Sequence, residues 1–213
     1  VLEYSMASLV LVRHGQSQWN EKNLFTGWKD PDLTEKGEKE AVAVGISLNE
    51  SGYKFDLMFT SVLLRAKRTG ELILAKLNQS NLKIIKNKAL NERDYGDLSG
   101  LNKDDARKKW GEEQVHRWRR SFNTPPPGGE SLQNTAERVL PYFYEKIMPN
   151  LKEDKEIIVV AHGNSLRALV MDLDNLSPKE VVKLEIPTGI PYCYQINYQG
   201  EVENKTLIDI KIE

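Results

Sequence analysis

Two of the three histidines in this chain lie in nearly the same local sequence, which indicates a shared chemical role. His14 follows the apolar run Leu9–Val12 after one residue, Arg13, and His162 follows Ile157–Val160 after one residue. Short, uninterrupted, β-branched runs are typical of strands buried on both faces of a parallel sheet. Ligands of open α/β sheets bind beyond the carboxyl ends of the strands, so adjacent strands would bring both imidazoles to one crevice.

This arrangement suits the transfer of a phosphoryl group. A neutral imidazole is a good nucleophile near physiological pH, and it can carry a transferred group covalently. The glycine after each histidine lets the backbone approach an anion closely, and the helix start that follows supplies free N–H groups. Two core histidines hydrogen-bonded beneath a sheet would show the same local pattern, but the pairing with Arg13 favours phosphoryl chemistry.

Composition limits the classes of function. The 213 residues, of which 39% are hydrophobic, suffice for a single domain over residues 1–213. Within it, residues 1–7 are expected to be disordered or to derive from a cloning vector. A net charge of -1 offers no general attraction to nucleic acid or to an anionic membrane. The longest apolar stretches are too short to span a bilayer, and no secretory leader is evident, so we expect a cytoplasmic protein.

Cysteine and histidine are too few for a metal or disulfide framework. Cys193 is the only cysteine, so no internal disulfide can form, and we interpret it as a small buried hydrophobic residue. The three histidines and this cysteine lack the spacing of metal ligands, so no metal site is expected.

The order of predicted elements indicates strands alternating with helices. Besides the two histidine strands, strands are expected at Leu57–Thr60, Leu82–Lys86, Tyr192–Asn197 and Val202–Ile210, the last two as a hairpin. Helices are expected from the N-cap Thr34 to near Gly52, over Ala66–Leu77, around Val115–Phe122, over Leu132–Ile147 with a kink at Pro141, from Ser165, and after the capping box Ser177–Glu180. We therefore predict a three-layer α/β/α fold, with helices on both faces of a mostly parallel sheet and a helical insertion over the active site.

The residues around both histidines match a known family. The chain resembles the histidine phosphatase superfamily, and within it the cofactor-dependent phosphoglycerate mutases, over about residues 8–198. Besides the Arg13-His14-Gly15 signature, ten ordered segments carry the resemblance: Leu9–Asn20, Phe25–Trp28, Asp32–Thr34, Thr60–Ala66, Leu90–Gly96, Gly100–Lys103, Trp118–Phe122, Thr124–Pro127, Ala161–Ala168 and Ile186–Gly189.

The resemblance implies roles for individual residues. His14 would be the nucleophile that becomes phosphohistidine, and Glu92 the general acid and base. The side chains implied to enclose the phosphoryl oxygens are those of Arg13, Arg65, His162 and Asn20, with Ser17, Gly163 and Asn164 nearby. Those implied to hold the far end of the substrate are Thr26, Gly27, Tyr95, Lys103, Arg119 and Arg120. On spacing alone the arginines other than Arg13 would be solvated surface residues and Glu92 an ordinary loop acid, so these assignments depend on the resemblance.

The implied activity is that of an isomerase. It would interconvert 3-phosphoglycerate and 2-phosphoglycerate in glycolysis and gluconeogenesis, by intramolecular phosphotransfer through a phosphohistidine primed by 2,3-bisphosphoglycerate, without a metal. The implied partners are small-molecule phosphoglycerates, and a homo-oligomer is compatible with the sequence. Alternatives are a phosphomonoester phosphatase of the same superfamily and a non-catalytic module that binds phosphorylated ligands.

Two departures from the family concern the cover of the site. Only Gly128 separates the Pro125–Pro127 run from Gly129-Glu130-Ser131-Leu132, where many members carry a long insertion, and the sequence ends at Glu213 without an extended tail. Water competes with the substrate for a phosphohistidine, and lids exclude it. A short lid predicts some hydrolysis beside the mutase reaction.

Overall fold

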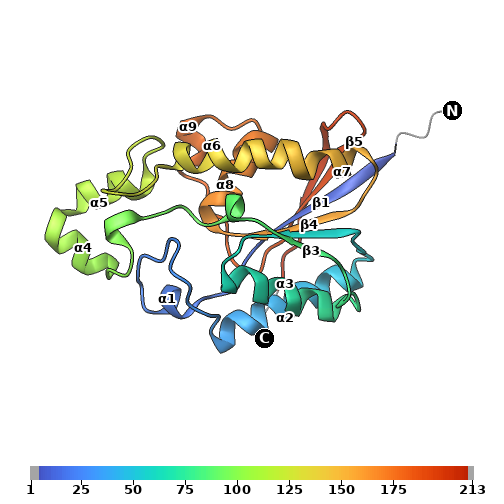
Figure 1. Cartoon of the computed structure of the whole chain (residues 1–213), viewed down its shortest axis with the longest axis horizontal. Coiled ribbons are helices and arrows are strands. Elements are labelled where there is room, and N and C mark those ends of the chain that lie inside the picture. The colour runs from blue at the N-terminus through green and yellow to red at the C-terminus, as the bar shows by residue number, and fades with distance from the viewer. Residues whose placement is uncertain (1–4, 211–213) are drawn as a thin grey trace.

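A six-stranded sheet forms the centre of the molecule in the computed structural model, which describes residues 5–210 (Figure 1). Its strands, in the spatial order β3-β2-β4-β1-β5-β6, are Ile84–Lys86, Leu57–Thr60, Ile157–Ala161, Met6–Arg13, Tyr192–Asn197 and Val202–Leu207. The first four in that order pair in parallel, whereas β5 pairs antiparallel with β1 and β6 antiparallel with β5. The predicted mostly parallel sheet is confirmed.

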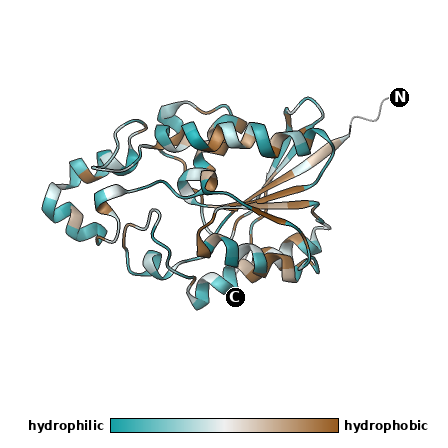
Figure 2. Ribbon diagram, viewed as in Figure 1, coloured by the Kyte–Doolittle hydropathy of each residue, from teal (hydrophilic) through white to brown (hydrophobic). Residues whose placement is uncertain are grey.

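Helices cover both faces of this sheet, because alternate side chains of each strand point to opposite sides. Val10 and Val12 of β1 pack toward α2 (Glu35–Glu50) and α3 (Leu64–Lys76). Leu9 and Leu11 pack on the other side, in a cluster with residues of α6 (Leu132–Tyr142), α7 (Met148–Lys152) and α8 (Gly163–Leu173). Figure 2 shows the apolar strands between two helical layers whose outer faces are hydrophilic, so the three-layer fold is confirmed.

The predicted helical insertion lies beyond one end of the sheet (Figure 1). It contains α4 (Lys103–Trp110) and α5 (Glu112–Arg120), preceded by two short 3-10 turns at Lys88–Leu90 and Gly96–Leu98. This part has a small core of its own, built from Phe25, Leu98, Ala106, Val115 and Trp118. The remaining helices are short: α1 (Gln18–Glu21) and α9 (Pro178–Val181).

Capping residues in the sequence predicted the starts of several helices. The Thr34 side chain accepts a hydrogen bond from the Gly37 amide at 3.1 Å, which confirms it as the N-cap of α2. The capping box predicted at Ser177 and Glu180 is also present. The helix expected from Ser165 begins two residues earlier, at Gly163.

Several predicted ends differ from the structure. Helix α5 ends at Arg120, so Phe122 is not part of it, because Ser121 is already extended before the proline-rich segment. Strand β6 ends at Leu207 rather than at residue 210, and β3 is three residues long. Residues 6 and 7 belong to β1, so the expected disorder does not extend to them, and residues 1–4 lie outside the described part of the chain.

The long helix predicted over Leu132–Ile147 is not a continuous α-helix, and the kink expected at Pro141 stays a prediction. Helix α6 ends at Tyr142, and a π-helical turn over Phe143–Ile147 follows it. Because proline has no N–H to donate, one hydrogen bond is missing at Pro141, but the Phe143 amide again donates to the Val139 carbonyl, so the departure from α-helical geometry begins after Pro141.

Cys193 is a buried residue, as predicted. Its side chain is 3% exposed and lies in the core beside α2.

Among the helices within residues 5–210, none has the length and apolar content needed to cross a membrane.

Candidate active site

The parallel pairing of β1 with β4 places the two histidines side by side. Arg13 lies opposite Ala161 in the register, and the His14 amide donates to the Ala161 carbonyl oxygen at 3.0 Å. The ring centroids of His14 and His162 are 4.9 Å apart, and both side chains are buried. The expectation that the two strands are adjacent and bring both imidazoles together is therefore correct.

The loop after His14 is shaped by two glycines. A Cβ atom on Gly15 would lie 2.1 Å from the carbonyl oxygen of Gly37, at the start of α2. Only glycine allows the two backbone segments to approach this closely. The packing of α2 thus determines the path of the chain directly after the histidine.

His14 has one nitrogen available for reaction. Its Nδ1 lies 2.6 Å from the Gly15 carbonyl oxygen, and since a carbonyl only accepts hydrogen bonds, Nδ1 carries the proton. Nε2 therefore keeps its lone pair, 3.4 Å from Nε of Arg65. Burial, reinforced by the charges of Arg65 and Arg13, lowers the pKa of His14 well below 6.5. The imidazole is neutral at physiological pH, which is its nucleophilic form.

Two guanidinium groups flank this nitrogen. Arg65 is 1% exposed and donates to two backbone carbonyls in residues 27–29, at 2.8 and 2.9 Å. Burial lowers its pKa to about 10, so it stays charged at neutral pH. Arg13 donates from Nη1 to the Ile186 carbonyl at 2.8 Å, while its buried Nε has no partner among the described residues. These two positive charges beside His14 can bind a phosphoryl group and neutralise the negative charge on its oxygens.

His162 lies beside His14 but is not among the side chains that line the cavity. Its Nε2 is 2.7 Å from Oγ of Ser61, and its buried Nδ1 has no partner among the described residues. Burial, with the charges of Arg65 and His14, lowers its pKa well below 6.5. A second neutral imidazole therefore packs against the first.

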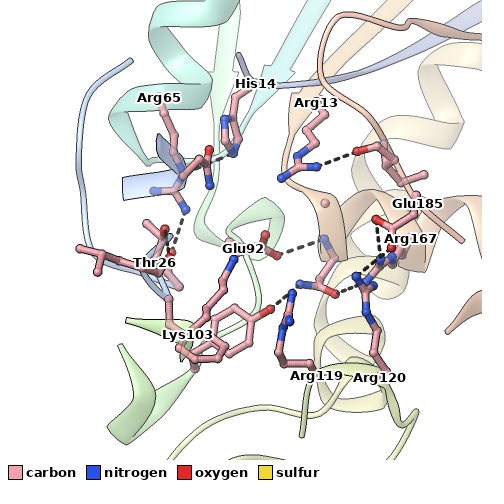
Figure 3. Close-up of a pocket in the computed structure, with 18 residues that line it drawn as sticks. Arg13, His14, Thr26, Arg65, Glu92, Lys103, Arg119, Arg120, Arg167 and Glu185 are labelled. Carbon is pink, nitrogen blue, oxygen red and sulfur yellow. Dashed lines mark hydrogen bonds and ion pairs between the residues drawn. The ribbon is translucent and has the colours of Figure 1, made fainter. Parts of the chain in front are cut away.

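Glu92 lies between the histidine end of the site and its far wall (Figure 3). Its Oε1 accepts from the backbone amides of Arg93 at 2.7 Å and Asn164 at 3.1 Å. No described residue is hydrogen-bonded to the other oxygen, Oε2. One oxygen is thus anchored, and the other can exchange a proton with a ligand.

Arg138, which sequence reasoning missed, holds the backbone of Glu92. Its guanidinium donates to the carbonyl oxygens of Ala89, Asn91 and Glu92 at 2.8, 3.1 and 2.8 Å, and it pairs with Glu130 at 3.0 Å. Arg138 lies on α6, outside the matched motifs. Nothing in its local sequence distinguishes it from a solvated helix residue.

The far wall of the site is also cationic. Lys103 is the first residue of α4, and Arg119 and Arg120 are the last two of α5. The Lys103 and Arg119 charges lie 5.7 and 6.0 Å from the centroid of the Phe25 ring. Burial and the neighbouring charges of Arg119 and Arg13 lower the pKa of Lys103 to about 8.

A cavity of about 170 Å³ joins the two ends of the site. The predicted residues that line it are Arg13, His14, Asn20, Thr26, Gly27, Arg65, Glu92, Tyr95, Lys103, Arg119, Arg120, Gly163 and Asn164. Ser17 does not line it, because this buried side chain caps α1 and accepts from the Asn20 amide at 3.1 Å. The lining residues that sequence reasoning missed are Leu24, Phe25, Arg167, Glu185 and Ile186.

Arg167 could have been found, because it lies three residues after Asn164 on the same helix face. Glu185 directly precedes a matched segment but carries no signal of its own. With these two included, six cationic side chains face two carboxylates in the cavity. A protein with a net charge of -1 therefore contains one strongly positive pocket, suited to a ligand with several negative charges.

Comparison with known proteins gives consistent results. The model of the histidine phosphatase superfamily, branch 1, matches residues 9–205. A protein from Parvibaculum lavamentivorans is 58% identical over 200 residues, covering 94% of this chain and 95% of its own. One from Rhizobium meliloti is 59% identical over 201 residues, with the same coverage. Both are named 2,3-bisphosphoglycerate-dependent phosphoglycerate mutase.

Solved structures share the fold. The α-ribazole phosphatase from Shigella flexneri superimposes with a TM-score of 0.79 at 23% identity, covering 97% of this chain and 96% of its own. The phosphoglycerate mutase from Bacillus anthracis superimposes with a TM-score of 0.73 at 23% identity, covering 98% and 94%. At these identities the likeness concerns the fold alone.

Proposed function

Since the chain belongs to the histidine phosphatase superfamily, we propose that it interconverts 3-phosphoglycerate and 2-phosphoglycerate as a 2,3-bisphosphoglycerate-dependent mutase. One observation carries the proposal: the cavity has a cationic wall at each end, with Glu92 between them. A phosphoglycerate carries a phosphate and a carboxylate, so it needs both walls. Hydrolysis of a simple phosphomonoester needs only the wall around His14.

The residues present also fit 2,3-bisphosphoglycerate, because six cationic side chains surround the cavity. When bound, this primer supplies the phosphoryl group with which the cycle begins. Arg13 and Arg65 hold the phosphoryl oxygens and neutralise their charge at His14. The cationic side chains away from His14 attract the anionic group at the other end of the substrate; they are Lys103, Arg119, Arg120 and Arg167.

The proposed chemistry is carried by His14 and Glu92. As Nε2 of His14 forms a bond to phosphorus, the bond from phosphorus to the substrate oxygen breaks, and Glu92 donates a proton to that oxygen. In the other half of the cycle a monophosphoglycerate lies beside the phosphohistidine, and Glu92 accepts the proton of its one free hydroxyl as that oxygen attacks phosphorus. The P–N bond then breaks, and the electron pair returns to Nε2. Glu92 therefore regains, within one cycle, the proton that it donated.

A coupled assay tests the proposal. Formation of 2-phosphoglycerate from 3-phosphoglycerate should require bisphosphoglycerate, and phosphoryl-labelled bisphosphoglycerate should give an acid-labile, base-stable phosphoprotein. His14→Ala should abolish both and still bind substrate, whereas His116→Ala, at an exposed position on α5, should retain both.

Two results would contradict the proposal. Release of inorganic phosphate without any 2-phosphoglycerate would identify a phosphatase. Label that persists in His14→Ala would show that another residue is the nucleophile.

A further inference from the structure

Glu185 is a carboxylate on the wall of a cationic pocket, and the proposed phosphoryl transfer does not use it. Its Oε1 lies 2.7 Å from Nη2 of Arg120, and its Oε2 lies 3.5 Å from Nη2 of Arg167 (Figure 3). The Glu185 side chain is 66% exposed. One carboxylate thus occupies two of the six cationic groups of the site.

The two arginines are held where a single anion can contact both. Arg167 is fixed in α8, because Nε donates to the Leu184 carbonyl at 2.7 Å and Nη1 to Oδ1 of Asn164 at 3.1 Å. Its side chain is only 8% exposed. Burial and the charge of Arg120 lower the pKa of Arg167, while the charge of Glu185 opposes this shift. The two guanidinium groups therefore repel each other unless an anion lies between them.

Arg119, the neighbour of Arg120, is arranged differently. Its guanidinium lies over the Phe25 ring and is paired with no carboxylate of the described chain. The two adjacent arginines are therefore not equivalent: Arg119 is available to a ligand, whereas Arg120 is engaged by Glu185. The mostly exposed Glu185 can rotate into solvent at little cost, but the buried Arg167 cannot.

We propose that Glu185 competes with the carboxylate of a phosphoglycerate for Arg120 and Arg167, and is displaced into solvent when that carboxylate binds. The inference rests on the proposed function, which supplies the ligand class. Glu185 then lowers the affinity for ligands that carry a second anionic group. It has little effect on ligands with a phosphate alone, which bind at Arg13 and Arg65. Glu185 is in this sense a specificity residue rather than a catalytic one.

The test compares two ligands that differ in one group. Glycerol 3-phosphate has a CH₂OH where 3-phosphoglycerate has the carboxylate, so only the latter should compete with Glu185. Calorimetric titrations in a His14→Ala background measure binding without turnover. Glu185→Gln keeps the shape and removes the charge, so the Kd for 3-phosphoglycerate should fall about three- to tenfold, the range of a partly exposed ion pair. The Kd for glycerol 3-phosphate should change less than about twofold.

Two control variants separate this competition from general effects. Glu71→Gln removes the same charge from an exposed position on α3 and should change neither Kd. In an Arg120→Gln background, Glu185→Gln should no longer improve binding of 3-phosphoglycerate by more than about twofold, because its principal partner is gone.

Several outcomes would overturn the inference. They are weaker binding of 3-phosphoglycerate by Glu185→Gln, no change for either ligand, or an equal change for both. If His14→Ala does not fold, the same titrations in wild-type protein without bisphosphoglycerate give the same comparison. Failure of the proposed function would appear separately, as a wild-type protein that forms no 2-phosphoglycerate in the primed assay.

Discussion

Acidification from pH 7.5 to 5.5 should destabilise the protein through its two buried histidines. In the folded state the pKa values of His14 and His162 are well below 6.5, mainly because burial disfavours the charged imidazole. In the unfolded chain both regain a pKa of about 6.5. The unfolded state therefore binds more protons as the pH falls. The stabilising contribution is complete above pH 6.5 and is lost progressively below it, down to the folded pKa values.

The size of the effect follows from proton linkage. A histidine that is protonated only in the unfolded state contributes a loss of about 1.4 kcal/mol between pH 7.5 and 5.5. The two histidines together should lower the free energy of unfolding by about 2.7 kcal/mol. Aspartate and glutamate titrate mostly below this range, at pKa values of about 4, and contribute little to it. A loss of this size is a large fraction of the stability of an ordinary domain.

Urea denaturation followed by tryptophan fluorescence measures this loss, in buffers without phosphate or sulfate, because such anions would bind the cationic pocket. In His162→Gln the loss between the two pH values should halve, to about 1.4 kcal/mol. His116→Gln, at an exposed position, should retain the full loss. Wild-type stability that does not change with pH, or a full loss in His162→Gln, would refute the assignment of buried neutral imidazoles.

Three further predictions concern activity. Glu92→Gln keeps the shape of the side chain but cannot exchange a proton, so kcat should fall about 10²-fold or more; near-normal turnover in a steady-state assay would remove this carboxylate from the mechanism. Arg138→Lys loses the fork that contacts three carbonyl groups of the Glu92 loop, so kcat should fall about tenfold or more with little change in KM. A lower Tm with unchanged kcat would instead show that Arg138 acts only on stability. Lys103, whose pKa is about 8, loses its charge as the pH rises, so the KM for 3-phosphoglycerate should increase above pH 8 in the wild type but not in Lys103→Arg. An equal increase in both proteins would exclude Lys103 as the cause.

The strands and helix starts could be predicted because their signals are local. The uninterrupted apolar runs before His14 and His162 match buried parallel strands, and such a run can be recognised without knowledge of the strand that pairs with it. Thr34 caps α2 through a contact three residues away. The capping box of α9 likewise joins Ser177 and Glu180, three residues apart. The predicted ends of helices and strands were less accurate, since the last residues of an element depend on the segments that pack against it.

The resemblance to a family identified most of the residues that line the cavity, but it could not assign their environments. Ser17 belongs to a matched segment and yet caps α1 instead of facing the cavity. Neither Arg138 nor Glu185 has a local signal. Their partners, the Glu92 carbonyl and the Arg167 guanidinium, are reached only through the packing of separate elements.

By itself, the sequence determined the strands that carry the histidines, the turns after them and the chemistry that these residue types can perform. The tertiary structure alone decided which imidazole nitrogen keeps its lone pair, why His14 is neutral and which two arginines Glu185 pairs with. The reason is physical. Strand and helix signals arise from neighbouring residues, whereas burial and charge pairing depend on atoms that are distant along the chain and close in space.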